Sequence, residues 1–106
     1  MNSFVIYTKK GSQFVMINTK VCVLAGKIGP KEFFLLEKYA REGCRIALMD
    51  RDKQMGMTVK EELEKSYNIS VFFFHGDTDS EEDRDLFSST VKQLYGQTDY
   101  IICSNK

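Results

Sequence analysis

The sequence lacks most of the features that mark specialised classes of protein. It has no Trp, one Pro and one His among 106 residues, and fifteen Lys and Arg balance fifteen Asp and Glu. A chain without net charge has no overall field that attracts nucleic acid or an anionic membrane surface. Disordered and collagen-like proteins are also excluded, because 42% of the residues are hydrophobic and Pro is scarce.

Cysteine is scarce as well. Cys22, Cys44 and Cys103 form no Cys-x-x-Cys pair, and their odd number argues against a disulfide framework. We expect all three to be small buried side chains rather than redox groups. No metal site is expected, because His75 is the only His and no two soft ligands lie close in the sequence.

Long apolar runs are missing too. No segment approaches the roughly 18 consecutive apolar residues of a membrane span, and the first ten residues lack the pattern of a secretory signal. We therefore predict a cytoplasmic protein with neither a membrane nor a nucleic-acid partner.

What is present is a change of periodicity at residue 21. Residues 1–20 predict a β-hairpin extension, because alternating apolar residues at 4–7 and 14–17 flank a polar turn at 9–12. From residue 21 onward, apolar runs alternate with helical stripes, such as that formed by Met55, Val59, Leu63 and Tyr67. We place strands at 21–25, 45–49, 69–74 and 100–103, and helices at 30–42, 52–67 and 80–96.

This succession predicts an α/β fold in a single domain over residues 1–106, with parallel strands joined by right-handed crossovers. Gly29 is the predicted N-cap of the first helix, Pro30 its first residue and Gly43 its end. Ser80 and Asp83 predict the start of the third helix. The acidic run at 77–83 is interpreted as this helix-starting turn and not as a calcium loop.

Four segments together resemble the amino-terminal half of the short-chain dehydrogenases/reductases. In order, these are VCVLAG, AREGCRIALMDRD, HGDTDSEED and YGQTDYIICSN. The resemblance covers residues 21–105, about four fifths of the chain. It implies half of a Rossmann fold, a three-layer structure whose parallel strands, counted from residue 21, have the order 3-2-1-4.

The glycine motif departs from the family pattern. Family members carry TGxxxGxG after the first strand; here Gly26 matches the first glycine, while Pro30 and Glu32 stand at the second and third. Pro30 removes an N–H donor, and Glu32 places a carboxylate where it repels phosphate. We interpret the segment as a helix start; the alternative is that Lys27 or Lys31 binds phosphate through its charge. No cofactor is assigned, and NAD or NADP binding is left open.

The resemblance implies further positions of a vestigial cofactor site. Asp50, with Arg51 beside it, matches the ribose-binding acidic residue, and Asp77 matches the residue that binds adenine. The alternatives are an acidic strand end or helix N-cap for Asp50 and a turn-forming role for Asp77. The predicted cofactor-binding residues are therefore Gly26, Lys27, Gly29, Asp50, Arg51, Asp77 and Ser104.

Catalytic residues are not expected. The resemblance places the family's Ser, Tyr and Lys beyond residue 106, and no Tyr in the sequence is followed by Lys four residues later. His75 has no nucleophile signal beside it, so a structural role is expected.

A partner is expected instead. In the half-fold two helices cover one face of the sheet and the third lies on the other face between strands one and four, leaving the far side of strand three uncovered. The strand at 100–103 becomes an apolar edge, and residues 33–36 are apolar around one helical turn. We predict a homodimer through this edge or through apolar helix faces.

The preferred function is a non-catalytic oligomerising or protein-binding module; the alternative is an NAD(P)-nucleotide-binding fragment or subunit of an oxidoreductase completed by another chain.

Overall fold

The main body of the protein is a parallel four-stranded sheet. A computed structural model describes residues 3–7, 14–18 and 20–104. The strands are β3 (Val21–Ala25), β4 (Arg45–Asp50), β5 (Val71–His75) and β6 (Tyr100–Cys103), in the order β5-β4-β3-β6. This confirms the predicted order 3-2-1-4.

The predicted hairpin is also present. Strands β1 (Ser3–Tyr7) and β2 (Phe14–Asn18) pair in antiparallel fashion and form a separate two-stranded sheet. The predicted turn at 9–12 lies outside the described residues.

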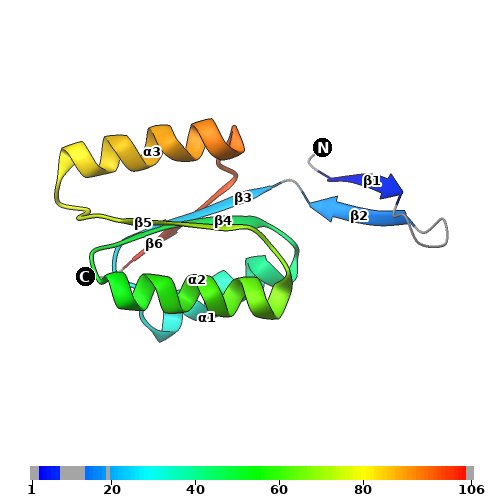
Figure 1. The fold of residues 1–106 in the computed structure, drawn as a ribbon, viewed down its shortest axis with the longest axis horizontal. Coiled ribbons are helices and arrows are strands. Elements are labelled where there is room, and N and C mark those ends of the chain that lie inside the picture. The colour runs from blue at the N-terminus through cyan, green and yellow to red at the C-terminus, as the bar shows by residue number, and fades with distance from the viewer. Residues whose placement is uncertain (1–2, 8–13, 19, 105–106) are drawn as a thin grey trace.

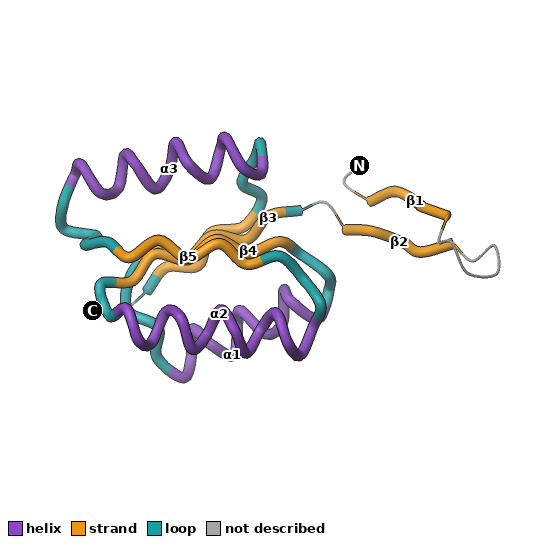
Figure 2. Tube along the Cα trace, viewed as in Figure 1, coloured by secondary structure: helices purple, strands orange, loops and turns teal. Residues whose placement is uncertain are grey.

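Three helices make the outer layers. Helices α1 (Pro30–Arg41) and α2 (Lys53–Tyr67) cover one face of the sheet, and α3 (Glu81–Tyr95) covers the other (Figures 1 and 2). The predicted three-layer arrangement is therefore confirmed. Among the described residues, no helix is both long and apolar enough to cross a membrane.

The helix boundaries follow local capping. The Oγ of Ser80 accepts a hydrogen bond from the Asp83 amide at 3.2 Å, as the sequence predicted. For α2 the cap is Asp52, whose Oδ1 accepts from the Met55 amide at 3.0 Å. Gly43 follows α1 with a φ of 88°, a left-handed conformation that favours glycine.

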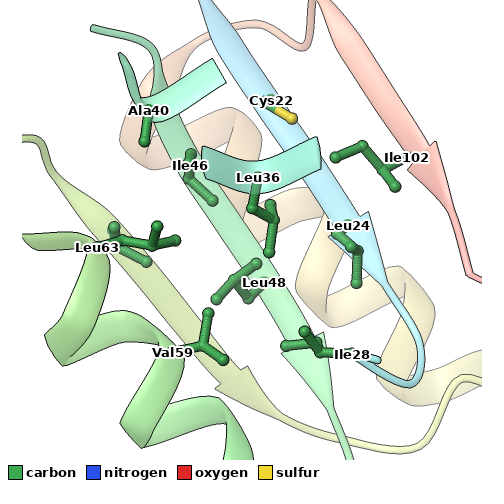
Figure 3. Close-up of a cluster of buried hydrophobic side chains, with 11 residues drawn as sticks. Cys22, Leu24, Ile28, Leu36, Ala40, Ile46, Leu48, Val59, Leu63 and Ile102 are labelled. Carbon is green, nitrogen blue, oxygen red and sulfur yellow. The ribbon is translucent and has the colours of Figure 1, made fainter. Parts of the chain in front are cut away.

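The larger part of the core lies between the sheet and the helices α1 and α2 (Figure 3). Leu36 of α1 and Leu63 of α2 are fully buried against the central strands. The strand residues that meet them alternate along β3 and β4, so that one side chain in two points to this face. They include Cys22, Leu24, Ile46 and Leu48.

The opposite face is covered differently from the expectation. Phe87 and Val91 of α3 are buried in a second cluster with Ala47 of β4, and the rings of Phe72 and Phe74 on β5 lie 6.2 and 5.9 Å from the ring of Phe87. The prediction that the far side of β5 is uncovered is therefore wrong. Helix α3 lies over β4 and β5 because the aromatic rings on β5 pack against Phe87.

Three side chains on predicted helical stripes or strands are exposed. Leu94, which continues the stripe of Phe87 and Val91 in the sequence, is 54% exposed, whereas the neighbouring Tyr95 packs on the sheet. Met55 is 41% exposed at the start of α2. Cys103 is exposed because it alternates with the inward-pointing Ile102, whereas Cys22 and Cys44 are buried as predicted.

The two sides of α1 offer a matched test of the core. Replacing Leu36 by Ala removes a fully buried side chain, so the free energy of unfolding should fall by about 2–5 kcal/mol. Phe34 on the same helix is 67% exposed, and Phe34→Ala should change stability by no more than about 0.5 kcal/mol. Urea unfolding followed by circular dichroism measures both; equal losses would contradict the packing of α1.

Candidate functional site

A cleft of about 620 Å³ opens at the carboxyl edge of the parallel sheet. The loops that follow β3 and β4 line it together with Ser104, which follows β6, and the strand order reverses between β3 and β6. Open α/β sheets bind ligands at such a point, and the volume falls in the range of small-molecule sites. The lining residues are Ala25, Gly26, Lys27, Ile28, Asp50, Arg51, Asp52, Met55, Thr78, Asp79 and Ser104.

The loop after β3 is held tightly against the residue that follows β6. Gly26 has a φ of 134°, and its amide donates to the carbonyl of Met49 at 2.8 Å. A Cβ at this position would lie 2.7 Å from the Cβ of Ser104, and the hydroxyl of Ser104 donates to the carbonyl of Lys27. Both the backbone conformation and the close approach therefore require glycine at position 26.

Asp50 connects two loops at the floor of the cleft. Its side chain is buried, with Oδ2 accepting from the amide of Ile28 at 3.3 Å and Oδ1 from the amide of Asp52 at 3.0 Å. Both oxygens are thus engaged by the backbone of this chain. The alternative that Asp50 is the N-cap of α2 is wrong, since Asp52 occupies that position.

A second carboxylate occupies the start of α1. Glu32 is 6% exposed, and its Oε1 accepts from the amide of Gly29 at 2.9 Å. Pro30, at the first turn, has no N–H to offer. A helix N-terminus attracts anions through its free amides and its dipole, and here the chain's own carboxylate supplies that anion.

The far wall of the cleft carries a loose ion pair. The Nη1 of Arg51 lies 3.7 Å from Oδ1 of Asp77, and since both side chains are well exposed the pair adds little stability. The same Oδ1 accepts from the amide of Asp79 at 2.9 Å, so Asp77 forms a turn of the Asx type. Nε2 of His75 lies 3.0 Å from the carbonyl oxygen of Arg51, which joins the ends of β4 and β5.

The predicted cofactor-binding residues gather at this one edge. Gly29 lies beside the cleft on a smaller apolar groove of about 310 Å³, and Asp77 immediately precedes the lining residue Thr78. Sequence reasoning did not assign six lining residues to the site: Ala25, Ile28, Asp52, Met55, Thr78 and Asp79. For Ile28, its position between two glycines of the same loop was the available signal. The predicted residues that line the cleft itself are Gly26, Lys27, Asp50, Arg51 and Ser104.

The two groups whose pKa values are clearly shifted, Lys20 and Cys22, are not among the residues that line the cleft. Lys20 donates through Nζ to the hydroxyl of Tyr100 at 3.0 Å, and this hydrogen bond raises the pKa of Lys20. The pair sits at the amino ends of β3 and β6, at the opposite end of the strands. Burial raises the pKa of the Cys22 thiol to about 12, which keeps it protonated. The described part of the chain has no cluster of His, Cys, Asp or Glu arranged to hold a metal ion.

The role of Asp50 can be tested by removing its oxygens. Asp50→Ala leaves the buried amide of Ile28 without its acceptor, so stability should fall by about 1–3 kcal/mol. Amide hydrogen exchange followed by NMR should accelerate at Ile28 and Asp52. The neighbouring, exposed Arg51→Ala serves as the control and should leave both exchange rates unchanged; acceleration in the control alone would refute the assignment.

Comparisons with known proteins bear on the fold. No protein-family model matches the sequence, and no curated protein sequence matches it. Solved structures do match. L-sorbose reductase from Gluconobacter frateurii, complexed with NADPH and L-sorbose, superposes with a TM-score of 0.78 at 22% identity, over 85% of this chain and 34% of that one.

Two further solved structures have a similar fold over about the same part of this chain. NAD+-bound xylitol dehydrogenase gives a TM-score of 0.74 at 24% identity, over 80% of this chain and 32% of its own. A metagenomic short-chain oxidoreductase in complex with NADP gives 0.72 at 19% identity, over 80% of this chain and 38% of that one. The chain thus spans about a third of the length of these proteins. The predicted resemblance to the Rossmann half of the short-chain dehydrogenases/reductases is confirmed as a shared fold over about four fifths of this chain.

Proposed function

We propose that this chain is a non-catalytic, short-chain-dehydrogenase-like half-domain that acts by binding a second copy of itself through the edge of β6. The proposal rests on the observation that β6 is an edge strand with an exposed apolar side chain. Within the described residues β6 pairs only with β3, and its Ile101 side chain is 72% exposed. An exposed apolar edge strand offers unpaired backbone groups to another strand.

A second copy fits this edge by symmetry. A two-fold axis perpendicular to the sheet places the two β6 strands antiparallel and closes the assembly as a dimer. The Ile101 side chains of both copies then lie on the same face of the joined sheet and bury part of their apolar surface. The joined sheet has twice the strands of one copy, and the two β6 strands become internal while β5 of each copy forms its outer edges.

The lack of catalysis in this proposal rests on sequence and geometry together. No Tyr is followed by Lys four residues later, and the contact between Lys20 and Tyr100 lies at the far end of the strands from the cleft. The carboxylates of Asp50, at the end of β4, and of Glu32, in the first turn of α1, are both engaged by backbone amides, so neither is poised as a general acid or base.

A second candidate is an NAD(P)-nucleotide-binding fragment or subunit of an oxidoreductase completed by another chain. The cleft at the carboxyl edge supports it, because Gly26 and Asp50, which the resemblance implies as cofactor-binding residues, both line this cleft. The solved structures of similar fold carry NAD+, NADPH or NADP.

Self-association is tested by sedimentation velocity at micromolar concentration. The wild-type chain should sediment at twice its monomer mass of 12.2 kDa. Ile101→Lys places a charge in the joined edge and should give the monomer, whereas Phe34→Lys, on the exposed side of α1, should leave the dimer intact. A wild-type monomer would refute the proposal, and loss of the dimer in Phe34→Lys alone would assign the interface to the helix face instead.

The second candidate is tested by thermal unfolding with NAD(H), NADP(H) and AMP. A ligand that binds only the folded state stabilises it by RT ln(1 + [L]/Kd), so a dissociation constant a hundredfold below the ligand concentration would contribute about 2.7 kcal/mol. The candidate predicts a rise in unfolding temperature at millimolar ligand. An unchanged unfolding temperature with every ligand would remove it.

A further inference from the structure

We propose that the apolar groove between α1 and α2 receives the Phe34 side chain of a second copy of this chain, in a reciprocal contact separate from the β6 edge. Helices α1 and α2 cover one face of the sheet (Figures 1 and 2), whereas β6 forms one of its edges. The inference therefore goes beyond the proposed function, since it concerns another surface of the molecule.

The groove lies beside the first turns of α1 and α2. Its volume is about 310 Å³, and its apolar wall includes Pro30 and Phe33 of α1 and Met55 and Val59 of α2. The Met55 side chain is exposed, and a flexible methionine adjusts readily to a side chain that enters beside it. The groove therefore offers an apolar site that is open to solvent in the described part of the chain.

An aromatic side chain stands next to this groove on the same helix. Phe34 is 67% exposed, and Pro30, which lines the groove, lies four residues before it on the same face of α1. Phe33 instead packs against the core. Aromatic side chains are favoured anchors of protein interfaces. A surface with both an exposed ring and an apolar groove is complementary to itself, as a two-fold contact between identical chains requires.

The charges on the two sides of this contact are opposite. The neighbours of Phe34 on the surface of α1 carry a positive balance, with three cations and one carboxylate: Lys31, Lys38, Arg41 and Glu37. The charged residue that lines the groove is Glu62, whose Oε2 accepts from the hydroxyl of Ser66 at 3.4 Å. A serine leaves the negative charge of Glu62 in place, so the cations around Phe34 of one copy attract this carboxylate of the other.

The small size of the contact sets its strength. Each aromatic side chain that enters a groove buries roughly 150–250 Å², and a two-fold contact buries two of them. Stable interfaces bury about 1,200–2,000 Å². We therefore expect this association at concentrations well above those at which β6 edges pair, so that it joins β6-paired dimers to one another.

Sedimentation equilibrium of the full chain carrying Ile101→Lys isolates this contact from the β6 edge. At concentrations up to about 1 mM this variant should form dimers, and adding Phe34→Glu should weaken the association at least about tenfold. The change removes the ring and places a carboxylate against Glu62. The matched control is Leu94→Glu, at a similarly exposed side chain of α3 on the opposite face, and it should leave the association unchanged.

A mixing experiment tests whether the contact is reciprocal. In the same Ile101→Lys chain, Thr58→Arg places a long side chain across the groove and leaves Phe34 intact. Neither Phe34→Glu nor Thr58→Arg should associate alone. Their equimolar mixture should associate, because the ring of one variant enters the open groove of the other, and this recovery also shows that both variants are folded.

Three outcomes would overturn the inference. They are an Ile101→Lys chain that stays monomeric up to the same concentration, an equal loss of association in Leu94→Glu, and a mixture that does not associate. The first of them would leave the groove to an occupant other than a second copy. The proposed β6 pairing fails separately, if the wild type is monomeric at micromolar concentration; association that depends on Phe34 at higher concentration would then still support the inference.

Discussion

The buried carboxylate of Asp50 is the interaction on which the carboxyl edge of this protein depends. A charge at 3% exposure is costly unless its oxygens are hydrogen-bonded, and here the amides of Ile28 and Asp52 supply those bonds. Because one amide follows β3 and the other follows β4, a single side chain fixes both loops. The floor of the cleft and the start of α2 are therefore set by the same residue.

Glu32 repeats this principle at the start of α1. A Rossmann-like half-fold presents a helix N-terminus to its cleft, and such a terminus is ready to bind an anion. In this chain the buried carboxylate of Glu32 accepts from the Gly29 amide at that helix N-terminus. The sheet has the strand order of the half-fold. The fold is shared with NAD+-bound xylitol dehydrogenase and with L-sorbose reductase complexed with NADPH, whereas Pro30 and Glu32 of this chain depart from the glycine motif of the family that it resembles, and function follows the site.

Much of the fold could be predicted because its signals are local. Apolar runs located β3 and β6 at the residues found, and the capping pair Ser80 and Asp83 located the start of α3. The position of α3 over β4 and β5 could not be read in the same way. It depends on contacts between Phe87 and the rings of β5, which join residues far apart in the sequence.

The candidate site was predictable to a similar degree. The resemblance to the family implied Gly26 and Asp50 as site residues, and both line the cleft. What Asp50 binds was not predictable, since its partners are backbone amides, which every residue type except Pro carries. Asp52 was likewise placed in the helix, whereas it is the residue that caps it.

The central claim is that the chain's own carboxylate occupies the anion position at the start of α1. It is tested most directly by following the amide signal of Gly29 in 1H–15N spectra while the side-chain carboxyl carbon of Glu32 is titrated with acid in the absence of ligand. The account predicts that the two signals move along one titration curve, because the amide donates to that carboxylate. A Gly29 signal that stays in place while Glu32 takes up its proton would contradict it.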